Sequence, residues 1–401
     1  MPNAEVLEGS EAVALAVKAC RPQVISAYPI SPQTHIVEAL ARIIANGELD
    51  SEYVRVESEF SAASVVSGAS AAGSRSYTAS SSQGLLLMTE VLYASAGMRL
   101  PFVMTAVNRA VSAPITIQVD HQDTISLRDA GLIQLYVESA QEAYDSHIAA
   151  FKIAEDPNIM LPVFVCMDGW ILTHSYERVS FIRQKDIDDF LPPFRPTNFL
   201  DVNNPKTWGS YAEEDVLMEF KYAIQVAMQH AKRRVKEVFA ELAALTGRDH
   251  GGLIEPYRTR DAEIILVAMG SMVGTIKETI DRLRSQGQAI GLIKIRCYRP
   301  FPFEDILKHI KGAKVVAVLD ANFSMGSEGA VGMDLKAKLC GRSEAPIVVD
   351  FIAGLGGREV NEDRIIEVVE KAREIGRSGF PPDEPLWVGL NSSLIEEGTK
   401  Q

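Results

Sequence analysis

VISAYPISP, the stretch from Val24 to Pro32, decides how the first part of the chain is interpreted. Its apolar start, Val24 to Ala27, predicts a short strand, and the pattern that follows as far as Ile44 predicts a helix directly after it. Pro32 suits the first position of that helix and Ser31 suits its N-cap. The free N–H groups at such a junction can bind an anion, for instance a carboxylate. An ordinarily capped helix explains the same residues.

The alternation of strand and helix continues through the first half of the chain. Further strands are predicted at residues 53–57, 76–79, 101–107 and 161–168, and helices at 61–73, 85–96 and 141–155. Strands separated by helices predict a parallel sheet whose two faces are covered. Prolines between residues 190 and 212 indicate a long connection, and the charged amphipathic pattern of 213–247 predicts a helix that ends at Gly247.

The same rhythm restarts at residue 261. Strands are predicted at 263–268, 290–295, 315–319 and 346–351, and helices at 273–285, 303–310 and 329–339. The sequence therefore predicts an α/β protein with two parallel-sheet domains, residues 1–250 and 251–401. The long connection and the helix before residue 250 would join them.

Composition and charge exclude several classes of protein. The net charge of −13 argues against a nucleic-acid-binding surface, although it is compatible with a local basic site for an anion. No apolar run reaches the roughly 18–20 uncharged residues that a membrane helix needs. Met1–Glu5 shows no basic segment leading into an apolar one, so a cytoplasmic protein is expected. The four cysteines form no Cys-x-x-Cys pair, so ligands for a zinc ribbon or a ferredoxin-type cluster are not expected.

Two polar patches adjoin the predicted strands. Glu57-Ser58-Glu59 precedes a helix rich in small residues. Its carboxylates can be solvated, can cap that helix, or can bind N1′ of the aminopyrimidine ring of thiamine diphosphate. The second patch, Thr78-Ala79-Ser80-Ser81-Ser82-Gln83-Gly84, joins a strand to an apolar helix. Its small side chains let the backbone approach a ring-shaped ligand, although such turns are common.

Arg109 follows the strand at 101–107, at the edge where open α/β sheets bind ligands. Its guanidinium can hold a carboxylate with two hydrogen bonds, whereas a surface ion pair is the commoner role of a lone Arg. Asp120-His121-Gln122-Asp123 is the remaining polar cluster. Its spacing matches no metal-site template, so a hydrogen-bonded loop is expected there rather than a set of metal ligands.

In their order along the chain, these patches closely resemble the 2-oxoacid:ferredoxin oxidoreductase family, in particular the α subunit of its pyruvate:ferredoxin (2-oxoacid:acceptor) members. The resemblance rests on Tyr28-Pro29-Ile30-Ser31-Pro32, Glu57-Ser58-Glu59, Ser82-Gln83-Gly84-Leu85-Leu86-Leu87-Met88, Asn108-Arg109-Ala110 and Asp120–Asp123 with Arg128-Asp129. It continues through Leu191-Pro192-Pro193-Phe194, Val267–Ser271, Tyr298–Pro302 and Ala353–Gly357, and so covers essentially the whole chain.

The resemblance implies that the first domain binds the aminopyrimidine half of thiamine diphosphate and that the second is similar to the C-terminal domain of transketolase. It gives the carboxylate at N1′ to Glu59 and the contacts with the substrate carboxylate to Arg109 and Ser31. It gives further cofactor contacts to Tyr28, Pro29, Ser82, Gln83 and Gly84. The family commonly has Thr where Ser31 stands and often Trp where Leu132 stands, so the side chain of the 2-oxoacid is left open.

Thiamine enzymes bind diphosphate and Mg²⁺ with a Gly-Asp-Gly motif that is followed roughly 25–30 residues later by Asn. This motif is missing here, because Asp168-Gly169 lacks the first Gly. The resemblance therefore implies β, γ and δ subunits that supply Mg²⁺ and [4Fe-4S] clusters, with coenzyme A and a 2-oxoacid as substrates and ferredoxin as electron acceptor. Pyruvate is the expected 2-oxoacid. The alternatives are an aryl or branched-chain 2-oxoacid such as phenylglyoxylate, NAD as final acceptor, and a non-oxidative thiamine-dependent lyase or transketolase-like subunit.

Overall fold

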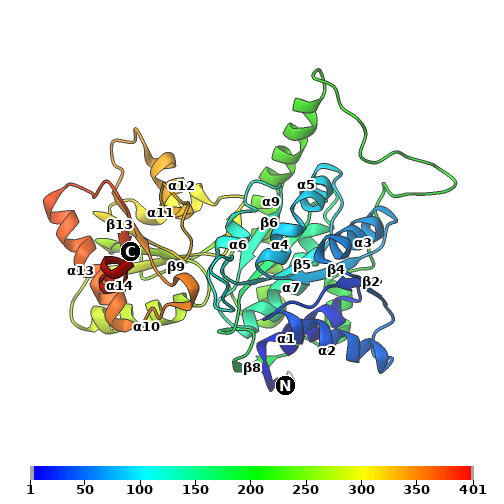
Figure 1. Cartoon of the computed structure of the whole chain (residues 1–401), viewed down its shortest axis with the longest axis horizontal. Helices are drawn as coiled ribbons and strands as arrows, with labels where there is room; N and C mark the ends of the chain where they lie inside the picture. Colours follow the sequence, from blue (N-terminus) through cyan, green and yellow to red (C-terminus); the bar gives the residue numbers. More distant parts are fainter. Residues whose placement is uncertain (1–3, 399–401) are drawn as a thin grey trace. The chain divides into compact units, whose positions relative to one another are not determined.

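The computed structural model describes residues 4–398 (Figure 1). Residues 1–3 and 399–401 lie outside the described part. The first of these ranges belongs to Met1–Glu5, the segment in which no targeting signal is expected. The chain forms two compact units. The first contains the chain up to Glu255 and the segment Ile295–Pro302, and the second contains Pro256–Lys294 and the chain from Phe303 onward. Both units are α/β structures with parallel sheets, which confirms the predicted fold class.

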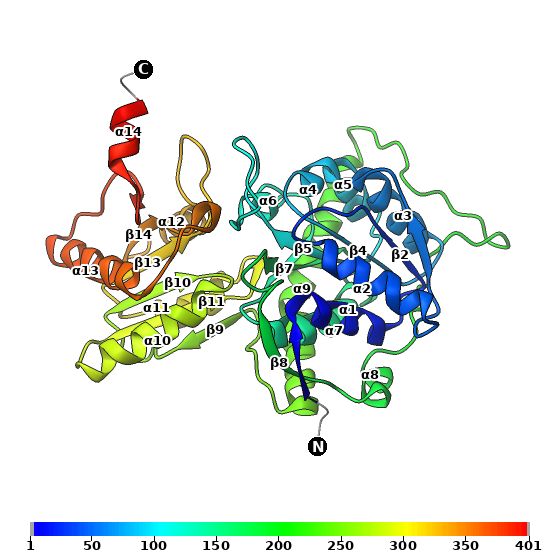
Figure 2. The ribbon, with the colours of Figure 1, turned by 60° about the horizontal axis from the view of Figure 1, so that its bottom comes forward.

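A seven-stranded sheet forms the centre of the first unit. In spatial order its strands are β12 (Cys297–Arg299), β6 (Ile133–Tyr136), β7 (Val163–Asp168), β5 (Val103–Asn108), β4 (Ser76–Ser80), β2 (Val24–Ala27) and β3 (Glu52–Arg55). All neighbours are parallel except β12, which runs antiparallel to β6. Figure 2 shows the separate antiparallel pair of β1 (Ala4–Glu8) and β8 (Tyr176–Ser180).

The helices of the first unit pack in groups. They are α1 (Gly9–Cys20), α2 (Thr34–Ala45), α3 (Glu59–Ala71), α4 (Gln83–Leu87), α5 (Thr89–Gly97), α6 (Gln122–Ile125), α7 (Ala140–Ala154), α8 (Gln184–Phe190) and α9 (Leu217–Thr246). Helix α1 packs on α2 and α7, and α3 packs on α4 and α5. Small residues let α3 approach its neighbours closely: Ser67 contacts Ser95 of α5, and Ser70 Oγ donates to Pro101 O at 2.7 Å.

Two local predictions are wrong. The pattern predicts Ser31 and Pro32 as the N-cap and first residue of α2, but the helix begins at Thr34. A turn closed by the 2.8 Å hydrogen bond from Gln33 N to Ile30 O takes up these positions instead. The apolar run predicted as one helix over 85–96 forms two short helices, α4 and α5, which meet at Met88. By contrast, α9 ends as predicted, because Gly247 adopts the left-handed conformation (φ 72°) that terminates helices.

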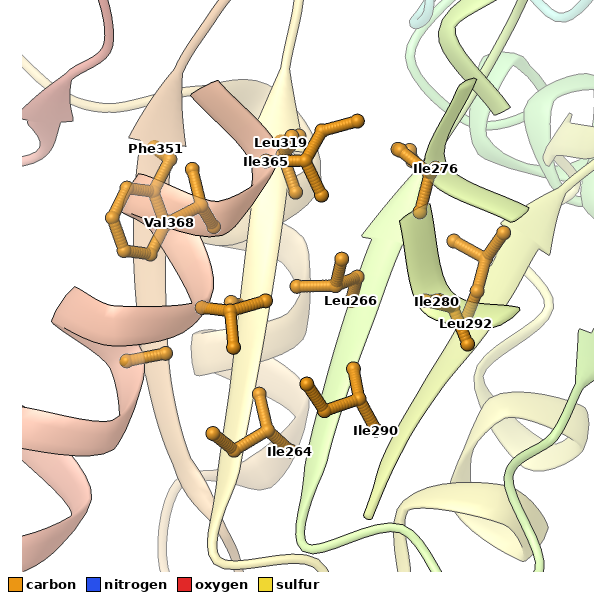
Figure 3. Close-up of a cluster of buried hydrophobic side chains, with 14 of the residues drawn as sticks. Ile264, Leu266, Ile276, Ile280, Ile290, Leu292, Leu319, Phe351, Ile365 and Val368 are labelled. Atoms are coloured by element: carbon orange, nitrogen blue, oxygen red, sulfur yellow. The ribbon is translucent and has the colours of Figure 1, made fainter. Parts of the chain in front are cut away.

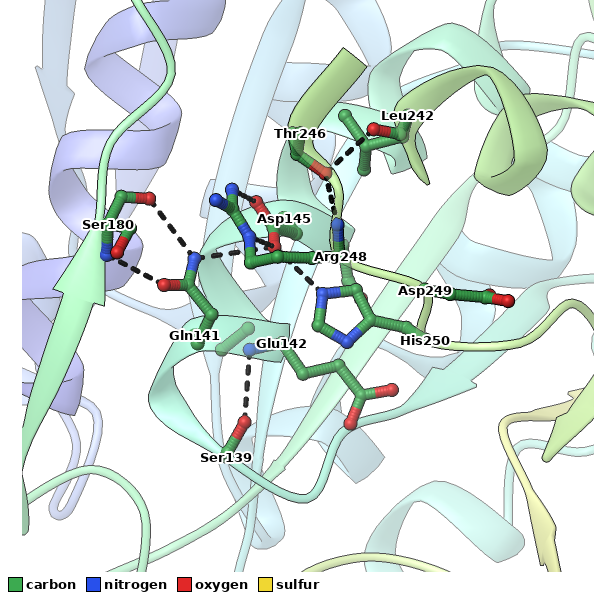
Figure 4. Close-up of polar contacts among 12 residues, drawn as sticks. Ser139, Gln141, Glu142, Asp145, Ser180, Leu242, Thr246, Arg248, Asp249 and His250 are labelled. Carbon is green, nitrogen blue, oxygen red and sulfur yellow. Dashed lines mark hydrogen bonds and ion pairs between the residues drawn. The ribbon is translucent and has the colours of Figure 1, made fainter. Parts of the chain in front are cut away.

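Buried ion pairs hold the later segments of the first unit to α7. Asp145 of α7 is fully buried and accepts hydrogen bonds from Arg248 Nε and Nη2, at 2.7 and 2.6 Å, and its Oδ2 lies 2.8 Å from His250 Nε2 (Figure 4). Arg296, within the returning segment Ile295–Pro302, donates from Nε to Glu142 Oε1 at 2.5 Å. An unpaired buried charge is costly, so these pairs favour packing of the segments after α9 against α7.

The second unit is built on a six-stranded sheet with the order β15 (Leu386–Trp387), β14 (Ile347–Ile352), β13 (Val315–Asp320), β10 (Ile264–Ala268), β11 (Ile290–Ile295) and β9 (Ile254–Tyr257). Its helices are α10 (Met272–Ser285), α11 (Phe303–Ile310), α12 (Ala330–Leu339), α13 (Glu362–Ser378) and α14 (Ser392–Gly398), with a 3₁₀ turn η1 (Leu355–Gly357). Strands β11, β10, β13, β14 and β15 are parallel to their neighbours in that series.

Alternate residues of these strands form a core with α10 and α13 (Figure 3). Ile264 and Leu266 of β10 belong to it, and Ile276 of α10 and Ile365 of α13 pack on the same side. The intervening residues, such as Ile265, are buried as well. Both faces of the sheet are thus covered, which explains why its strands are continuous apolar runs in the sequence. Among the helices described between residues 4 and 398, none is long and apolar enough to cross a membrane.

Candidate active site

The polar patches of the sequence meet at one edge of the seven-stranded sheet. Strands β2, β4 and β5 are adjacent and parallel, so the residues that follow them share the edge at their carboxyl ends. Tyr28 follows β2, Ser81 follows β4 and Arg109 follows β5. Glu59 begins α3, which follows the neighbouring strand β3. This is the edge at which open α/β sheets bind their ligands.

Glu59 is positioned by the start of α3. Ser58 is the N-cap, and its Oγ accepts a 3.2 Å hydrogen bond from Ser61 N. Glu59 is only 7% exposed, yet within residues 4–398 its carboxylate has no hydrogen-bond or ion-pair partner. A buried carboxylate without a hydrogen-bond partner is unusual, because hydrogen bonds normally offset the free-energy cost of removing the charge from water. The group is therefore suited to a ligand that can donate a hydrogen bond.

Gly84 packs directly against the Glu59 side chain. An ideal Cβ atom on Gly84 would lie 2.7 Å from Glu59 Oε1 and 2.8 Å from Glu59 Cγ, and it would also collide with Ser80 Oγ. Any side chain at this position would have to displace Glu59. The hydroxyls of Thr78, Ser80 and Ser81 are buried nearby along β4 and its end, and none has a hydrogen-bond partner within the described residues. Such orphaned groups need a ligand or a water molecule as partner.

Arg109 is the cation of the site. Its Nη1 donates to Ser31 O at 2.5 Å and its Nη2 donates to Gln83 Oε1 at 2.6 Å. The residue is 7% exposed, and its buried Nε finds no hydrogen-bond partner in the part of the chain that is described. Burial lowers the pKa of Arg109, whereas the charges of Asp123 and Glu59 raise it. A buried guanidinium with an unused N–H is suited to an anionic ligand.

Asp123 connects the segments that carry Gln83 and Arg109 through hydrogen bonds. Its Oδ2 accepts hydrogen bonds from Ser82 N and Arg109 N, both at 3.0 Å. Its Oδ1 accepts from Asn108 Nδ2 at 2.9 Å and from Thr124 N at 2.8 Å. Burial raises the pKa of Asp123 to about 6, although these hydrogen bonds lower it. The expected hydrogen-bonded loop is present, and its aspartate holds the site together.

Ser82 takes an unusual backbone conformation, with φ 49° and ψ −122°. Non-glycine residues rarely adopt it, and the hydrogen bond to Asp123 holds it in place. The Ser82 side chain is fully buried and its Oγ donates to Ala110 O at 2.8 Å, so this residue shapes the turn between β4 and α4.

The remaining residues of the edge differ in exposure. Tyr28 is 38% exposed, and Pro29 and Ser31 are exposed as well. Gln33, which the sequence pattern did not single out, donates from Nε2 to Ala79 O at 2.9 Å and so ties the turn after β2 to β4. Its only signal was its place directly after the Tyr28–Pro32 motif.

A buried pair, His121 and Asp168, lies at the same edge of the sheet. His121 Nε2 lies 2.9 Å from Asp168 Oδ1 at the end of β7. Burial lowers the pKa of His121, but the charge and hydrogen bond of Asp168, together with the charges of Asp120 and Asp123, raise it overall. Gly169 comes next, and a Cβ there would lie 2.6 Å from Asn108 O and 2.7 Å from Pro32 Cγ. The loop after β7 thus packs closely on those after β5 and β2.

Comparisons with known proteins agree with this architecture. The family model for the thiamine-diphosphate-binding part of pyruvate flavodoxin/ferredoxin oxidoreductases matches residues 15–240, and that for core domain II of pyruvate:ferredoxin oxidoreductase matches residues 262–365. Pyruvate synthase subunit PorA of Methanosarcina barkeri is 50% identical over 392 residues, 97% of each chain. Ketoisovalerate oxidoreductase subunit VorA of Pyrococcus abyssi is 42% identical over 390 residues, 97% of this chain and 98% of that one.

A solved structure supports the fold. The 2-oxoglutarate:ferredoxin oxidoreductase from Magnetococcus marinus superposes with a TM-score of 0.73 at 20% identity over 92% of this chain. The chain spans 65% of that protein's chain, and at this identity the likeness concerns the fold alone. The family model over residues 15–240 and the 50% identity over nearly the whole chain confirm the family expected from the sequence motifs. The chain belongs to the pyruvate flavodoxin/ferredoxin oxidoreductase family.

Proposed function

We propose that this chain is the α subunit of a multi-subunit enzyme that oxidatively decarboxylates pyruvate with thiamine diphosphate and coenzyme A and passes the electrons to ferredoxin. The observation that carries the proposal is a pair of buried groups at one sheet edge, the Glu59 carboxylate and the Arg109 Nε–H, for which residues 4–398 supply no hydrogen-bond partner. The relatives named pyruvate synthase subunit PorA, 46–50% identical, support pyruvate over the ketoisovalerate of relatives at 42%.

The surroundings of Glu59 fit the aminopyrimidine ring of thiamine diphosphate. A flat ring needs a position without a side chain, which Gly84 offers, and its N1′ needs a carboxylate, which Glu59 offers. The hydroxyls of Ser80 and Ser81 are buried, and neither has a hydrogen-bond partner among the described residues. In this proposal they bind the polar edge of the same ring. In this proposal Glu59 holds a proton at N1′, and Gln83, Gly84 and the residues Tyr28 and Pro29 line the surroundings.

Arg109 and Ser31 fit the carboxylate of the 2-oxoacid. The Nε–H of Arg109 is unused, and its two Nη groups are fixed by Ser31 O and Gln83 Oε1. Those two acceptors orient the guanidinium without neutralising its charge, so the cation stays available to an anion. The exposed hydroxyl of Ser31 can add a second contact from the turn after β2.

Bound thiamine diphosphate supplies the carbon nucleophile for the 2-oxo group and accepts the electron pair that decarboxylation releases. The residues of this chain contribute the proton position at N1′ and the orientation of the substrate carboxylate. Burial of both groups strengthens these contacts, because the effective dielectric is lower than in water. Asp123 holds the backbone next to Gln83 and at Arg109 in place, because its Oδ2 accepts hydrogen bonds from Ser82 N and Arg109 N.

The proposal includes partner subunits. The chain has four cysteines, of which Cys20, Cys166 and Cys297 are buried and Cys340 is exposed, and no two are spaced as cluster ligands. The [4Fe-4S] clusters and the diphosphate-bound Mg²⁺ are therefore assigned to β, γ and δ subunits. Coenzyme A and ferredoxin complete the proposed set of reactants.

The direct experiment is to purify the complex through a tag on this chain and assay ferredoxin reduction with a panel of 2-oxoacids. The expected result is coenzyme A-dependent activity with the highest kcat/KM for pyruvate, while the isolated chain is colourless and inactive. Higher kcat/KM for 2-oxoisovalerate or phenylglyoxylate would overturn the substrate assignment. Decarboxylation that proceeds at full rate without an electron acceptor would overturn the oxidoreductase assignment in favour of a lyase.

A further inference from the structure

Three side chains of metal-ligating types converge in the first unit, and none of them is among the residues assigned above. Glu8, His35 and His174 each present one ligand atom, and these atoms lie within 4.8 Å of one another. His35 Nδ1 lies 2.6 Å from Glu8 Oε1, and the two imidazole rings have centroids 4.6 Å apart. The residues come from the end of β1, the first turn of α2 and the connection between β7 and β8. No other such group occurs among residues 4–398.

The backbone around this cluster is fixed. Gly9 N, next to Glu8, donates to Ser175 O at 3.0 Å, and Ser10 N donates to Thr173 O at 3.0 Å. Ser10 Oγ adds a 2.9 Å bond to the same Thr173 O. Glu8 and His174 are therefore held next to each other by three hydrogen bonds. Figures 1 and 2 show α1, α2 and β8 together on the same side of the first unit.

His174 is held in an orientation suited to a ligand. Its ring stacks on Trp170 with centroids 4.1 Å apart, and its Nδ1 lies 2.7 Å from Thr173 Oγ1. When Nδ1 carries the proton and donates to this hydroxyl, Nε2 presents its lone pair, an arrangement common for metal-bound histidines.

We propose that Glu8, His35 and His174 form a binding site for a transition-metal dication of the Zn²⁺ class. Two imidazoles and one carboxylate form a ligand set typical of Zn²⁺, whereas Mg²⁺ and Ca²⁺ prefer oxygen ligands alone. Ligand atoms in a tetrahedral zinc site are about 3.3 Å apart. The side chain of His35 is 49% exposed, so it can rotate to close the remaining distance. Water would complete the fourth position of a tetrahedral ion.

The test is a Zn²⁺ titration of the metal-free full-length chain by calorimetry, with Co²⁺ absorption as a second readout. The exposed Cys340 is replaced first (Cys340→Ser), because a thiol would bind Zn²⁺ as well. We expect one saturable site per chain, a higher Tm in the presence of Zn²⁺, and no competition from a tenfold excess of Mg²⁺. His35→Gln and His174→Gln should each weaken binding at least 10-fold.

His230→Gln, in α9, is the matched control, because it removes an imidazole far from the cluster in sequence and should leave the affinity unchanged. Absence of saturable binding in the parent chain would overturn the proposal. So would unchanged affinity in both His35→Gln and His174→Gln, provided that their Tm without metal equals that of the parent. Because the readout is metal binding, the result does not depend on the enzymatic activity proposed above.

Discussion

Gly84 lies so close to Glu59 that a Cβ atom on the glycine would fall 2.7 Å from Glu59 Oε1. The contact joins the start of α4 to the start of α3, two helices that follow different strands of the same sheet. A glycine here therefore has a purpose beyond the flexibility of a turn. It lets the start of α4 pack against a buried carboxylate that a side chain at this position would displace.

Gly84→Ala should displace the Glu59 carboxylate and reduce the kcat/KM of the assembled complex by at least 10-fold, because the Cβ would enter the space between Glu59 and Ser80. Gly68→Ala is the control, since an added Cβ at this exposed position of α3 meets nothing within 4 Å. The control should be fully active and slightly more stable, by up to about 1 kcal/mol. Equal activity of the two variants would show that Gly84 does not protect Glu59.

Asp123→Asn should loosen the turn after β4 and the residue after β5 together. The asparagine keeps one acceptor oxygen and turns an NH₂ group toward two N–H donors, and each buried donor left unpaired costs about 1–3 kcal/mol. A fall in the free energy of unfolding of about 2–6 kcal/mol is expected, together with a higher apparent Kd for thiamine diphosphate. Denaturant unfolding of the chain measures the first effect. Asp129→Asn, at a largely exposed side chain, should change neither quantity.

The second unit should become less stable as the pH rises. Burial, and then the charge of Asp320, raise the pKa of Asp350 to about 8, although the hydrogen bond from Gly329 N and the charge of Lys336 lower it. The folded chain thus keeps a proton that the unfolded chain releases above pH 4. Stability is fully present below that pH and is lost progressively as the pH rises through about 8.

Asp350→Asn removes this titration, so its Tm should vary less than that of the wild type between pH 5 and about 9. Thermal unfolding followed at several pH values compares the two proteins. A wild-type Tm that fell no more than that of the variant over this interval would show that Asp350 does not set the pH dependence.

Arg109→Lys in the assembled complex should raise the KM for pyruvate while the affinity for thiamine diphosphate stays within a few fold. Lysine keeps the charge but loses the planar fork, and a charge-assisted hydrogen bond of about 1.5–3 kcal/mol corresponds to roughly 10- to 150-fold in kcat/KM. Arg128→Lys, at a partly exposed neighbour of Asp129, is the control. If cofactor binding fails while the KM is unchanged, Arg109 does not face the substrate.

The order of strands and helices could be predicted because most strands of both sheets are buried on two faces. Ile264–Ala268 and Ile290–Ile295 are continuous apolar runs for that reason. The edge strands were harder to detect. Cys297–Arg299 pairs with Ile133–Tyr136 across more than 150 residues of sequence, and only three residues form the strand. Nothing local signals such a pairing.

The site could be predicted only in part for a similar reason. Glu59 and Arg109 follow strands of one parallel sheet, so their place at a common edge follows from the topology. Asp123 could not be assigned a role, because its acceptors serve Ser82 N and Arg109 N, 41 and 14 residues away. Glu8 and His174 likewise meet only through the folded backbone.

In the proposed mechanism Glu59 activates the cofactor through N1′, and exchange of the cofactor's C2 proton in the assembled complex reports this role. Glu59→Gln should slow this exchange by about 10²–10⁴-fold while the fold stays intact, because the amide cannot favour the protonated ring nitrogen. Glu57→Gln, two residues earlier and exposed, should exchange within a few fold of the wild type. A wild-type exchange rate in the Glu59→Gln complex would overturn this catalytic role and leave Glu59 a structural one.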